Sequence, residues 1–245
     1  MNDDQIETPR VAIRPFRCLS EASHLIADRY LLFVGLSAVA FVLGALTPMG
    51  ILMGSMMCGL SLCYFRKLRQ EEVSFDVLFK GFDYFVESLI ATLIVIAVTM
   101  VFIIPLYVVF FVMFVSTGLF WGRGGNAPAA GGGPEMLAVF GMMAVFYLAI
   151  LIVMLLVSTL TAFVYPLIVD RQLKAIPALK LSLKAVMTNF WGMLGLTLLN
   201  SIIVGLAYLC CILPSFLVLP ITFGANIIAY RRVFPELPSS PDIDA

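Results

Sequence analysis

Two long runs without a charged residue constrain this chain more than any other feature of its sequence. Ser88–Trp121 and Leu137–Val169 contain no Asp, Glu, Lys or Arg. An apolar segment of about 20 residues is long enough to cross a bilayer. The whole chain is 62% hydrophobic and 12% charged, whereas about a quarter of the residues are charged in a soluble protein. We therefore predict an all-α integral membrane protein.

Turn residues and charged stretches divide the chain into six apolar segments. These are Leu31–Thr47, Ile51–Phe65, Ser88–Trp121, Leu137–Val169, Phe190–Leu209 and Ile212–Tyr230. Pro and Gly in Thr47–Gly50 predict a tight turn, and Cys210–Ser215 predicts another. Residues 122–136 are rich in Gly, Ala and Pro, which is typical of a flexible loop. The pattern predicts six transmembrane helices in one domain, residues 31–230, with hairpins at both ends.

The segment Ser88–Trp121 is too long for one ordinary span. As a straight helix it would reach about 50 Å, whereas the hydrocarbon core is about 30 Å thick. Pro105 lies in its middle and removes a helical hydrogen bond. Three interpretations are open: a bent helix that projects beyond the membrane, a span that ends near Pro105 before a re-entrant or interfacial Leu106–Trp121, or two full spans.

The positions of the basic residues predict the orientation and exclude two full spans, because Lys and Arg concentrate in cytoplasmic loops. Six spans place all 15 Lys and Arg except Arg123 on one side. Residues 1–30 are then a cytoplasmic segment with an amphipathic helix, and 231–245 are a cytoplasmic tail. An additional span at 106–121 would place the basic cluster of 171–184 on the opposite side. We expect extracytoplasmic exposure of residues 122–136.

Amphipathic patterns precede three of the predicted spans. In Tyr64–Ser88, Leu78, Phe82 and Phe85 lie on one helical face, and charged residues lie on another. Similar segments lead into the first and fifth spans. Such helices lie in the membrane interface, and they predict three repeats of a surface helix followed by a hairpin. The alternative is that any cytoplasmic segment beside a membrane has this pattern.

Two stretches resemble a group of bacterial membrane proteins. Tyr165–Leu194 contains an Asp after a helix-end Pro, followed by the "ALKLS" surface helix, and Pro48–Phe85 contains a Pro/Gly turn, a small-residue helix and an "F..LF.GF" surface helix. Both resemble the membrane domain of glycerophosphoryl diester phosphodiesterases and the stand-alone YciC-like group. The resemblance implies a bacterial cytoplasmic (inner) membrane location. It implies no phosphodiesterase activity, because the catalytic domain is absent from this sequence. Residues 122–136 depart from the group and resemble an insertion.

Small and polar residues within the apolar segments are candidates for helix contacts. Gly50, Gly54, Cys58 and Gly59 have the spacing that lets helices approach closely in lipid. The partner is another helix of the same chain or a second copy in a homo-oligomer. Asn200 and Asn226 are the main polar side chains deep in the spans. They predict either a hydrogen bond that stabilises helix packing or a contact with a substrate.

Basic residues beside the spans are candidates for contacts with anionic lipid headgroups. The candidates are the basic clusters at 66–69, 171–184 and 231–232, and in particular Arg66, Lys67, Arg69, Arg171, Lys174, Arg231 and Arg232. The alternative is that they determine topology alone. The partners that we expect are membrane lipids, further copies of the chain or other membrane proteins, and no nucleic acid.

The sequence contains no recognisable catalytic constellation, and we expect no cofactor. His24 is the single histidine, and no Cys or His lies near it at the spacing of a metal site. We therefore predict a non-enzymatic protein with a scaffolding, assembly or lipid-organising role. The alternative is a channel or transporter for a small or lipidic solute, since Pro105, Pro166 and Pro220 interrupt apolar helices. The lack of ionisable residues in mid-membrane argues against coupled transport.

Overall fold

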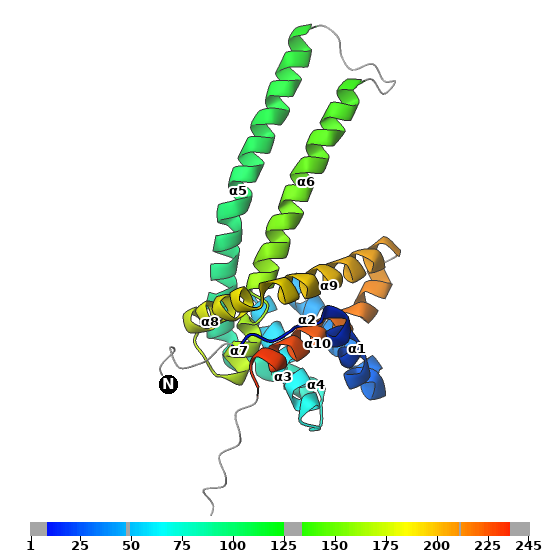
Figure 1. Cartoon of the computed structure of the whole chain (residues 1–245), viewed down its shortest axis with the longest axis vertical. Coiled ribbons are helices and arrows are strands. Elements are labelled where there is room, and N and C mark those ends of the chain that lie inside the picture. Colours follow the sequence, from blue (N-terminus) through cyan, green and yellow to red (C-terminus); the bar gives the residue numbers. More distant parts are fainter. Residues whose placement is uncertain (1–8, 48–49, 125–133, 211, 236–245) are drawn as a thin grey trace, which may run out of the picture. The chain divides into compact units, whose positions relative to one another are not determined.

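The computed structural model describes residues 9–47, 50–124, 134–210 and 212–235, and all regular structure among them is helical (Figure 1). The elements are α1 (Pro15–Ile26), η2 (Ala27–Arg29), α2 (Tyr30–Leu46), α3 (Met53–Leu68), α4 (Phe75–Phe79), η4 (Lys80–Tyr84), α5 (Phe85–Gly124), α6 (Pro134–Leu160), α7 (Val164–Asp170), α8 (Ala175–Thr188), α9 (Phe190–Cys210) and α10 (Ile212–Val233). The predicted all-α fold is confirmed. Most of the Gly-rich segment 122–136 and the ends of the predicted cytoplasmic segments lie outside the described residues.

Five stretches of the described chain are helical, long and apolar enough to cross a membrane. They are Pro15–Leu46, Phe75–Ser116, Val139–Asp170, Phe190–Cys210 and Pro214–Val233. The sequence predicted six, and the helix that does not qualify is α3. Its 16 residues extend about 24 Å at 1.5 Å per residue, and Arg66 and Lys67 occupy its last turn. The number and length of the apolar helices support a multi-pass membrane protein.

The two longest apolar segments fold differently from each other. Helix α5 passes through Pro105 as one continuous helix, so residues 106–121 continue that helix and form no separate re-entrant piece. Proline is tolerated in membrane helices because neighbouring groups satisfy the backbone groups that it frees. The other segment, Leu137–Val169, is divided by a turn at 161–163 into α6 and α7. The hydroxyl of Ser182 in α8 donates to the carbonyl of Leu160 at 2.9 Å, where α6 ends.

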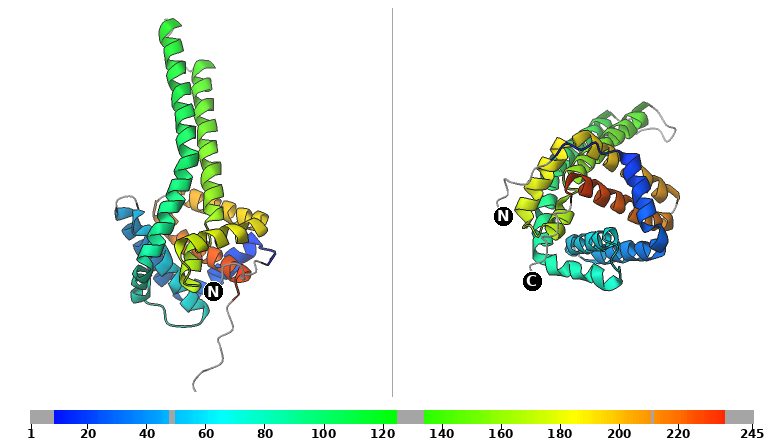
Figure 2. Two further views of the ribbon diagram at one scale, coloured as in Figure 1. Left: turned by 90° about the vertical axis from the view of Figure 1, so that its left-hand side faces the viewer. Right: turned by 60° about the horizontal axis from the view of Figure 1, so that its bottom comes forward.

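The chain divides into two compact units. Unit 1 comprises Met1–Leu93 and Ser158–Ala245, and unit 2 comprises Ile94–Val157. Within unit 1, α1 and α9 both pack on α10, while α3 packs on α2, α4, η4 and α7 (Figure 2). The ring of Tyr64 lies fully buried in this core, 4.8 Å from the ring centroid of Phe33 and 5.5 Å from that of Phe223.

The short helices that the sequence placed on the surface bury one face in unit 1. Cys18, Ala22 and Ile26 are the buried residues of α1, and Leu78 is a buried residue of α4. Phe82, which the sequence assigned to the same apolar face as Leu78, is 38% exposed. The apolar side of these helices therefore packs in the protein core through some residues and is exposed at the surface through others.

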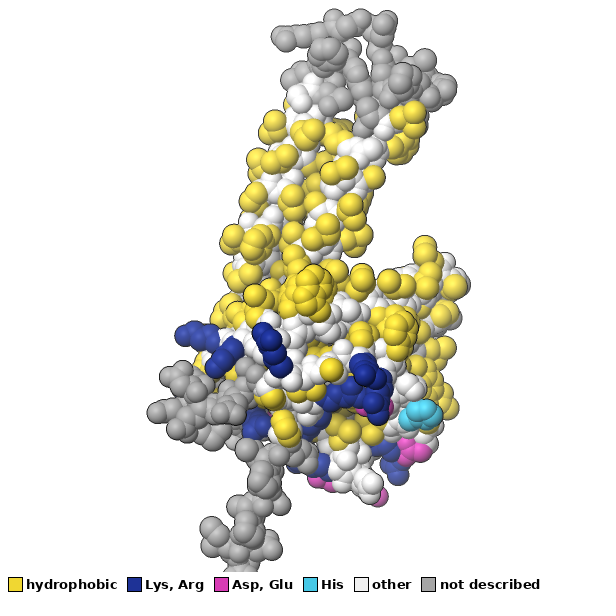
Figure 3. Space-filling model, in the orientation of Figure 1, with side chains coloured by type: hydrophobic (Ala, Val, Ile, Leu, Met, Phe, Trp, Pro, Cys, Tyr) yellow, Lys and Arg dark blue, Asp and Glu magenta, His cyan; other side chains and the backbone are white. Residues whose placement is uncertain are grey.

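Unit 2 consists of α5 and α6 residues lying side by side (Figure 1). Phe110 stacks on Phe146 with 4.2 Å between ring centroids, and Tyr107 meets Phe146 edge-on at 5.1 Å. Apolar side chains also cover the outward faces of the hairpin, including Phe111 at 65% and Leu151 at 65% exposure (Figure 3). So large an exposed apolar surface is typical of a helix pair that faces lipid.

Candidate functional site

A buried group of charged side chains joins α7 to α10 in unit 1. Asp170 is the last residue of α7, and its Oδ1 lies 2.9 Å from Nη2 of Arg231. The hydroxyl of Tyr230 donates to Oδ2 of Asp170 at 2.8 Å. Nε of Arg171 lies 3.4 Å from the same oxygen. We call Asp170, Arg171, Tyr230 and Arg231 the Asp170 cluster.

The Asp170 cluster places one carboxylate between two guanidinium groups in a region that excludes most solvent. The side chains of Asp170 and Arg171 are each 8% exposed, and that of Arg231 is 13% exposed. The Arg231 guanidinium lies 4.3 Å from the centroid of the Phe65 ring, and Nη2 of Arg171 donates to the carbonyl of Pro235 at 2.8 Å. Burial removes the hydration of these charged groups, which costs free energy. Charge-assisted hydrogen bonds and the contact of a guanidinium with an aromatic ring offset that cost. The arrangement joins the ends of α7 and α10.

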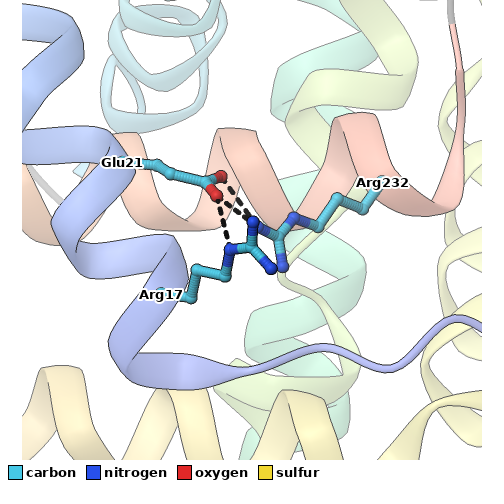
Figure 4. A network of polar contacts seen from close by, with 3 residues as sticks. All are labelled: Arg17, Glu21 and Arg232. Carbon is cyan, nitrogen blue, oxygen red and sulfur yellow. Dashed lines mark hydrogen bonds and ion pairs between the residues drawn. The ribbon is translucent and has the colours of Figure 1, made fainter.

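A second charged group joins α1 to α10 (Figure 4). Nη2 of Arg232 lies 2.7 Å from both carboxylate oxygens of Glu21. Nε of Arg17 lies 3.2 Å from Oε1 of the same carboxylate. The two positively charged side chains therefore share one carboxylate at the α1–α10 contact.

Ion pairs within the chain engage several of the seven basic residues predicted to contact lipid. Five of them take part in ion pairs within the chain: Arg66 with Glu71, Lys67 with Asp28, Arg171 and Arg231 with Asp170, and Arg232 with Glu21. Arg69 and Lys174 are exposed. No local pattern in the sequence indicates that Arg171 and Arg231 meet at Asp170, since the two arginines lie far apart along the chain.

Asn200 lies in the contact between α9 and α10. Its side chain is 8% exposed, and Nδ2 donates to the carbonyl of Thr222 at 3.3 Å. Asn226 lies one turn further along α10 and is partly buried. Oδ1 of Asn200 and Oδ1 of Asn226 are both buried with no hydrogen-bond partner among the described residues. The hydrogen bond from Asn200 to Thr222 is of the kind that stabilises helix packing.

Two tyrosines make further polar contacts with α10. The hydroxyl of Tyr64 in α3 donates to the carbonyl of Pro220, and that of Tyr30 in α2 donates to the carbonyl of Leu217, each at 2.5 Å. Pro220 lies inside α10 and lacks the backbone N–H of an ordinary helical residue. Side chains of α2, α3 and α9 thus bind carbonyls of α10 on both sides of this proline.

The small residues of α3 face other helices of the same chain. A Cβ atom at Gly54 would lie 2.6 Å from Oγ1 of Thr92 and 2.7 Å from the carbonyl oxygen of Ser88. A Cβ atom at Gly59 would overlap the carbonyl oxygen of Leu78. Cys58 is fully buried. The stripe therefore allows α4 and the first turns of α5 to approach the α3 backbone.

Gly50 differs from its predicted place in that stripe. It precedes α3, which begins at Met53, and its φ of +65° lies in the left-handed region that glycine adopts without strain. Its backbone N–H donates to the carbonyl of Thr47 at 3.1 Å. Gly50 therefore belongs to the turn between α2 and α3.

The outward face of α8 combines apolar and basic side chains. Ile176, Leu183 and Met187 are 54%, 37% and 64% exposed, and Lys180 and Lys184 are exposed on the same face. The opposite face is buried, with Ala178 and Ala185 at 0% exposure. We call this outward face the α8 face. Its lysines belong to the basic cluster of residues 171–184, which the sequence predicted as a contact for anionic lipid, and residues 171–235 contain six Lys and Arg and no Asp or Glu.

Among the described residues, no group of three or more His, Cys, Asp or Glu side chains is placed to hold a metal ion. Cys18, Cys58 and Cys63 are buried as free thiols, Cys210 is exposed, and Cys211 lies outside the described residues. No protein-family model, curated protein or solved structure matches the chain.

Proposed function

We propose that this chain is a non-enzymatic, multi-pass protein of the bacterial inner membrane that organises anionic lipids and, through them, a membrane assembly. The α8 face is the observation that carries the proposal. It presents exposed Ile, Leu, Met and Lys side chains on one side of a helix whose other side is buried in unit 1. Trp191 follows at 82% exposure in the first turn of α9, a helix of membrane length.

This combination fits the boundary between headgroups and acyl chains. Tryptophan is enriched at membrane interfaces, apolar side chains enter the acyl region, and lysine side chains extend toward headgroups. Each Lys or Arg near an anionic surface contributes about 1 kcal/mol to binding. A face with both kinds of side chain is expected to bind an anionic membrane more strongly than a neutral one.

We infer six spans with both termini in the cytoplasm, the sixth being the short helix α3. Support comes from the packing of α2 on α3 after the turn at Gly50, and from Arg66 and Lys67 in the last turn of α3. The order of elements also favours three repeats, because a short helix precedes each of the pairs α2–α3, α5–α6 and α9–α10. Membership of the YciC-like group is part of the same proposal.

Thiol labelling of intact spheroplasts tests this topology. In a chain with Ser in place of Cys210 and Cys211, in which the remaining Cys18, Cys58 and Cys63 are buried, a cysteine introduced at Asn126 should react with an impermeant reagent. A cysteine introduced at Gln70 should react only after lysis. Labelling of Gln70→Cys in intact spheroplasts would contradict six spans with cytoplasmic termini.

The transporter alternative has less support. Its best candidate contacts were Asn200 and Asn226, and Asn200 lies in a buried helix contact with its amide bonded to Thr222. The prolines inside α5 and α10 favour it, but in α10 the carbonyls of Leu217 and of Pro220 itself accept hydrogen bonds from the tyrosines of α2 and α3. Discontinuous helices of transporters usually direct such backbone groups toward a substrate instead.

Thermal unfolding in nanodiscs tests the lipid proposal. The purified chain should unfold at a higher temperature in phosphatidylglycerol than in phosphatidylcholine of the same acyl composition, because a ligand that binds the native state stabilises it. The double variant Lys180→Gln/Lys184→Gln should lose part of that difference. Lys80→Gln, which removes an exposed lysine from η4, should retain it. Equal unfolding temperatures of the unmodified chain in the two lipids would contradict the proposal.

A further inference from the structure

A groove of about 550 Å³ opens beside the α8 face in unit 1. One wall is the extended segment 10–13, and the other is the corner where α8 ends and α9 begins. Its lining includes the side chains of Arg10, Val11, Ile13, Met187, Thr188 and Trp191.

Asn189 and Gly192 fix the extended wall against the helical corner. Oδ1 of Asn189 accepts from the backbone N–H of Val11 at 2.8 Å, and Nδ2 donates to the carbonyl of Pro9 at 3.2 Å. A Cβ atom at Gly192 would lie 2.8 Å from Cβ of Ile13, so glycine is required for this approach. The groove is therefore a built feature of unit 1, held by specific contacts between distant parts of the sequence.

Positive side chains lie in and beside the groove, and the described residues that line it include no acid. Arg10 is exposed in its lining, and Lys184 is exposed one helical turn before Thr188, whose hydroxyl donates to the Lys184 carbonyl at 2.8 Å. Residues 9–17 carry three arginines and no acid, and residues 171–235 carry no acid either. Among the residues that the structure describes, the acidic residue nearest to the first wall along the chain is Glu21, which is engaged by Arg17 and Arg232. An anion that enters this groove meets the positive charge of Arg10 in the lining and approaches that of Lys184, which lies one helical turn before the lining residue Thr188.

The remaining lining is apolar and open to the surroundings. Trp191 is 82% exposed and Met187 is 64% exposed, while Val11 and Ile13 lie along the other wall. A soluble anion would gain nothing from these side chains. An amphiphile with a phosphate beside Arg10 and Lys184, and with its glycerol and first methylenes beside Trp191 and Met187, would use both parts of the lining.

We propose that this groove is the headgroup site for one anionic phospholipid, of the phosphatidylglycerol type. This inference rests on the proposed lipid-organising function and names the site at which a single lipid is retained. The phosphodiester is the recognised group, Arg10 and Lys184 supply the positive charge, and Trp191 contacts the interfacial part of the lipid. The start of α9, a helix of membrane length, places the groove at the level of the headgroups when α9 spans the bilayer.

Native mass spectrometry of the full chain tests the site. The chain is released from nanodiscs that contain equal amounts of phosphatidylglycerol and phosphatidylethanolamine, and the lipids that remain bound are counted. The unmodified chain should retain phosphatidylglycerol first. Arg10→Glu and, separately, Lys184→Glu should weaken that first binding step about fivefold to tenfold. Lys80→Glu carries the same change of charge on η4 and should change it by less than about twofold.

The outcomes separate the site from the general function. If the unmodified chain prefers phosphatidylglycerol and neither Arg10→Glu nor Lys184→Glu reduces the preference, the groove is not the site although the lipid-organising function stands. If the unmodified chain shows no preference, the proposed function itself fails. Excess inorganic phosphate should not release the retained lipid, and its release by phosphate would assign the groove to a soluble anion. Trp191→Ala should weaken the binding of phosphatidylglycerol without changing that of phosphate.

Discussion

Unit 1 and unit 2 are both made of apolar helices, yet different contacts join the helices in each. In unit 1, the hydroxyl of Tyr64 and the amide of Asn200 bind carbonyls of α10, and the Asp170 cluster joins α7 to α10. In unit 2, α5 and α6 meet through aromatic rings such as Phe110 and Phe146. In Pro214–Val233, half of the residues in the most apolar stretch are buried inside the protein. In Phe75–Ser116, no residue of the most apolar stretch is buried.

The comparison shows that hydropathy alone does not say whether a helix faces lipid or the protein. Helix α3 is flanked by apolar segments, but its glycines, serines and cysteines are buried against neighbouring helices. Helices α5 and α6 carry long runs of branched and aromatic residues that stay exposed. In lipid, small and polar residues join helices because burial of apolar side chains gives little advantage there. Substitutions that remove or add a small or polar group should therefore lower the stability of unit 1 more than that of unit 2.

The largest effect is expected at Asp170. Asp170→Asn leaves the guanidinium groups of Arg171 and Arg231 close together without the carboxylate between them, and breaking a buried pair costs about 3–5 kcal/mol of unfolding free energy. Reversible unfolding in mixed micelles measures this change. Asp28→Asn, at an exposed pair with Lys67, is the matched control and should leave the unfolding midpoint nearly unchanged. A small effect at both positions would mean that the Asp170 cluster does not stabilise unit 1.

Gly59 should be the next most sensitive position. A Cβ atom there overlaps the backbone of Leu78, so Gly59→Ala should destabilise unit 1 by about 1–3 kcal/mol as in other overpacked contacts. Gly141→Ala in unit 2 is the control, because no atom lies within 4 Å of the added Cβ, and the change should be neutral or slightly stabilising. Equal effects of the two substitutions on the unfolding midpoint would contradict the difference between the units.

A smaller loss is expected for Tyr64→Phe. The substitution removes only the hydroxyl that donates to the carbonyl of Pro220, and a buried hydrogen bond contributes about 1 kcal/mol. Tyr208→Phe changes an exposed tyrosine of α9 in the same way and should have no measurable effect. If the two variants unfold at the same temperature, the tyrosine contact with α10 does not stabilise unit 1.

The smallest effect is expected in unit 2. Phe146→Leu keeps an apolar side chain but loses the ring contacts with Phe110 and Tyr107, which are worth about 0.5–1.5 kcal/mol. Phe140→Leu, at an exposed ring of the same helix, is the control. A loss at Phe146 as large as that at Asp170 would mean that unit 2 depends on its contacts as strongly as unit 1.

Much of the helical framework was predictable from the sequence, because long apolar runs and Pro/Gly turns are local signals. The turn at Gly50 and the ends of α9 and α10 are examples. The continuity of α5 through Pro105 was not predictable, because the cost of a proline depends on the surroundings of the freed carbonyl. Neither was the break after Leu160, since Ser182, which binds its carbonyl, comes from another helix.

The candidate site was predictable only in part. Asn200 was recognised as a helix contact or a substrate contact because a polar residue in an apolar segment needs a partner. The Asp170 cluster was missed, since local sequence gives no sign that Asp170 and Arg231 meet across two helices. The α8 face was predictable, because Lys180 and Lys184 and the apolar residues beside them form an amphipathic pattern within one helix that leads into the fifth predicted span.

The depth of Trp191 in a bilayer is the most direct test of the proposed lipid function. In a Trp121→Phe chain reconstituted in phosphatidylglycerol-containing vesicles, Trp191 is the single remaining tryptophan. Its fluorescence should be quenched most by a nitroxide near the headgroup and least by one near the acyl chain end, because the α8–α9 corner lies at the interface. Strongest quenching by the deep nitroxide, or none by either, would contradict an interfacial α8 face and with it the proposed lipid function.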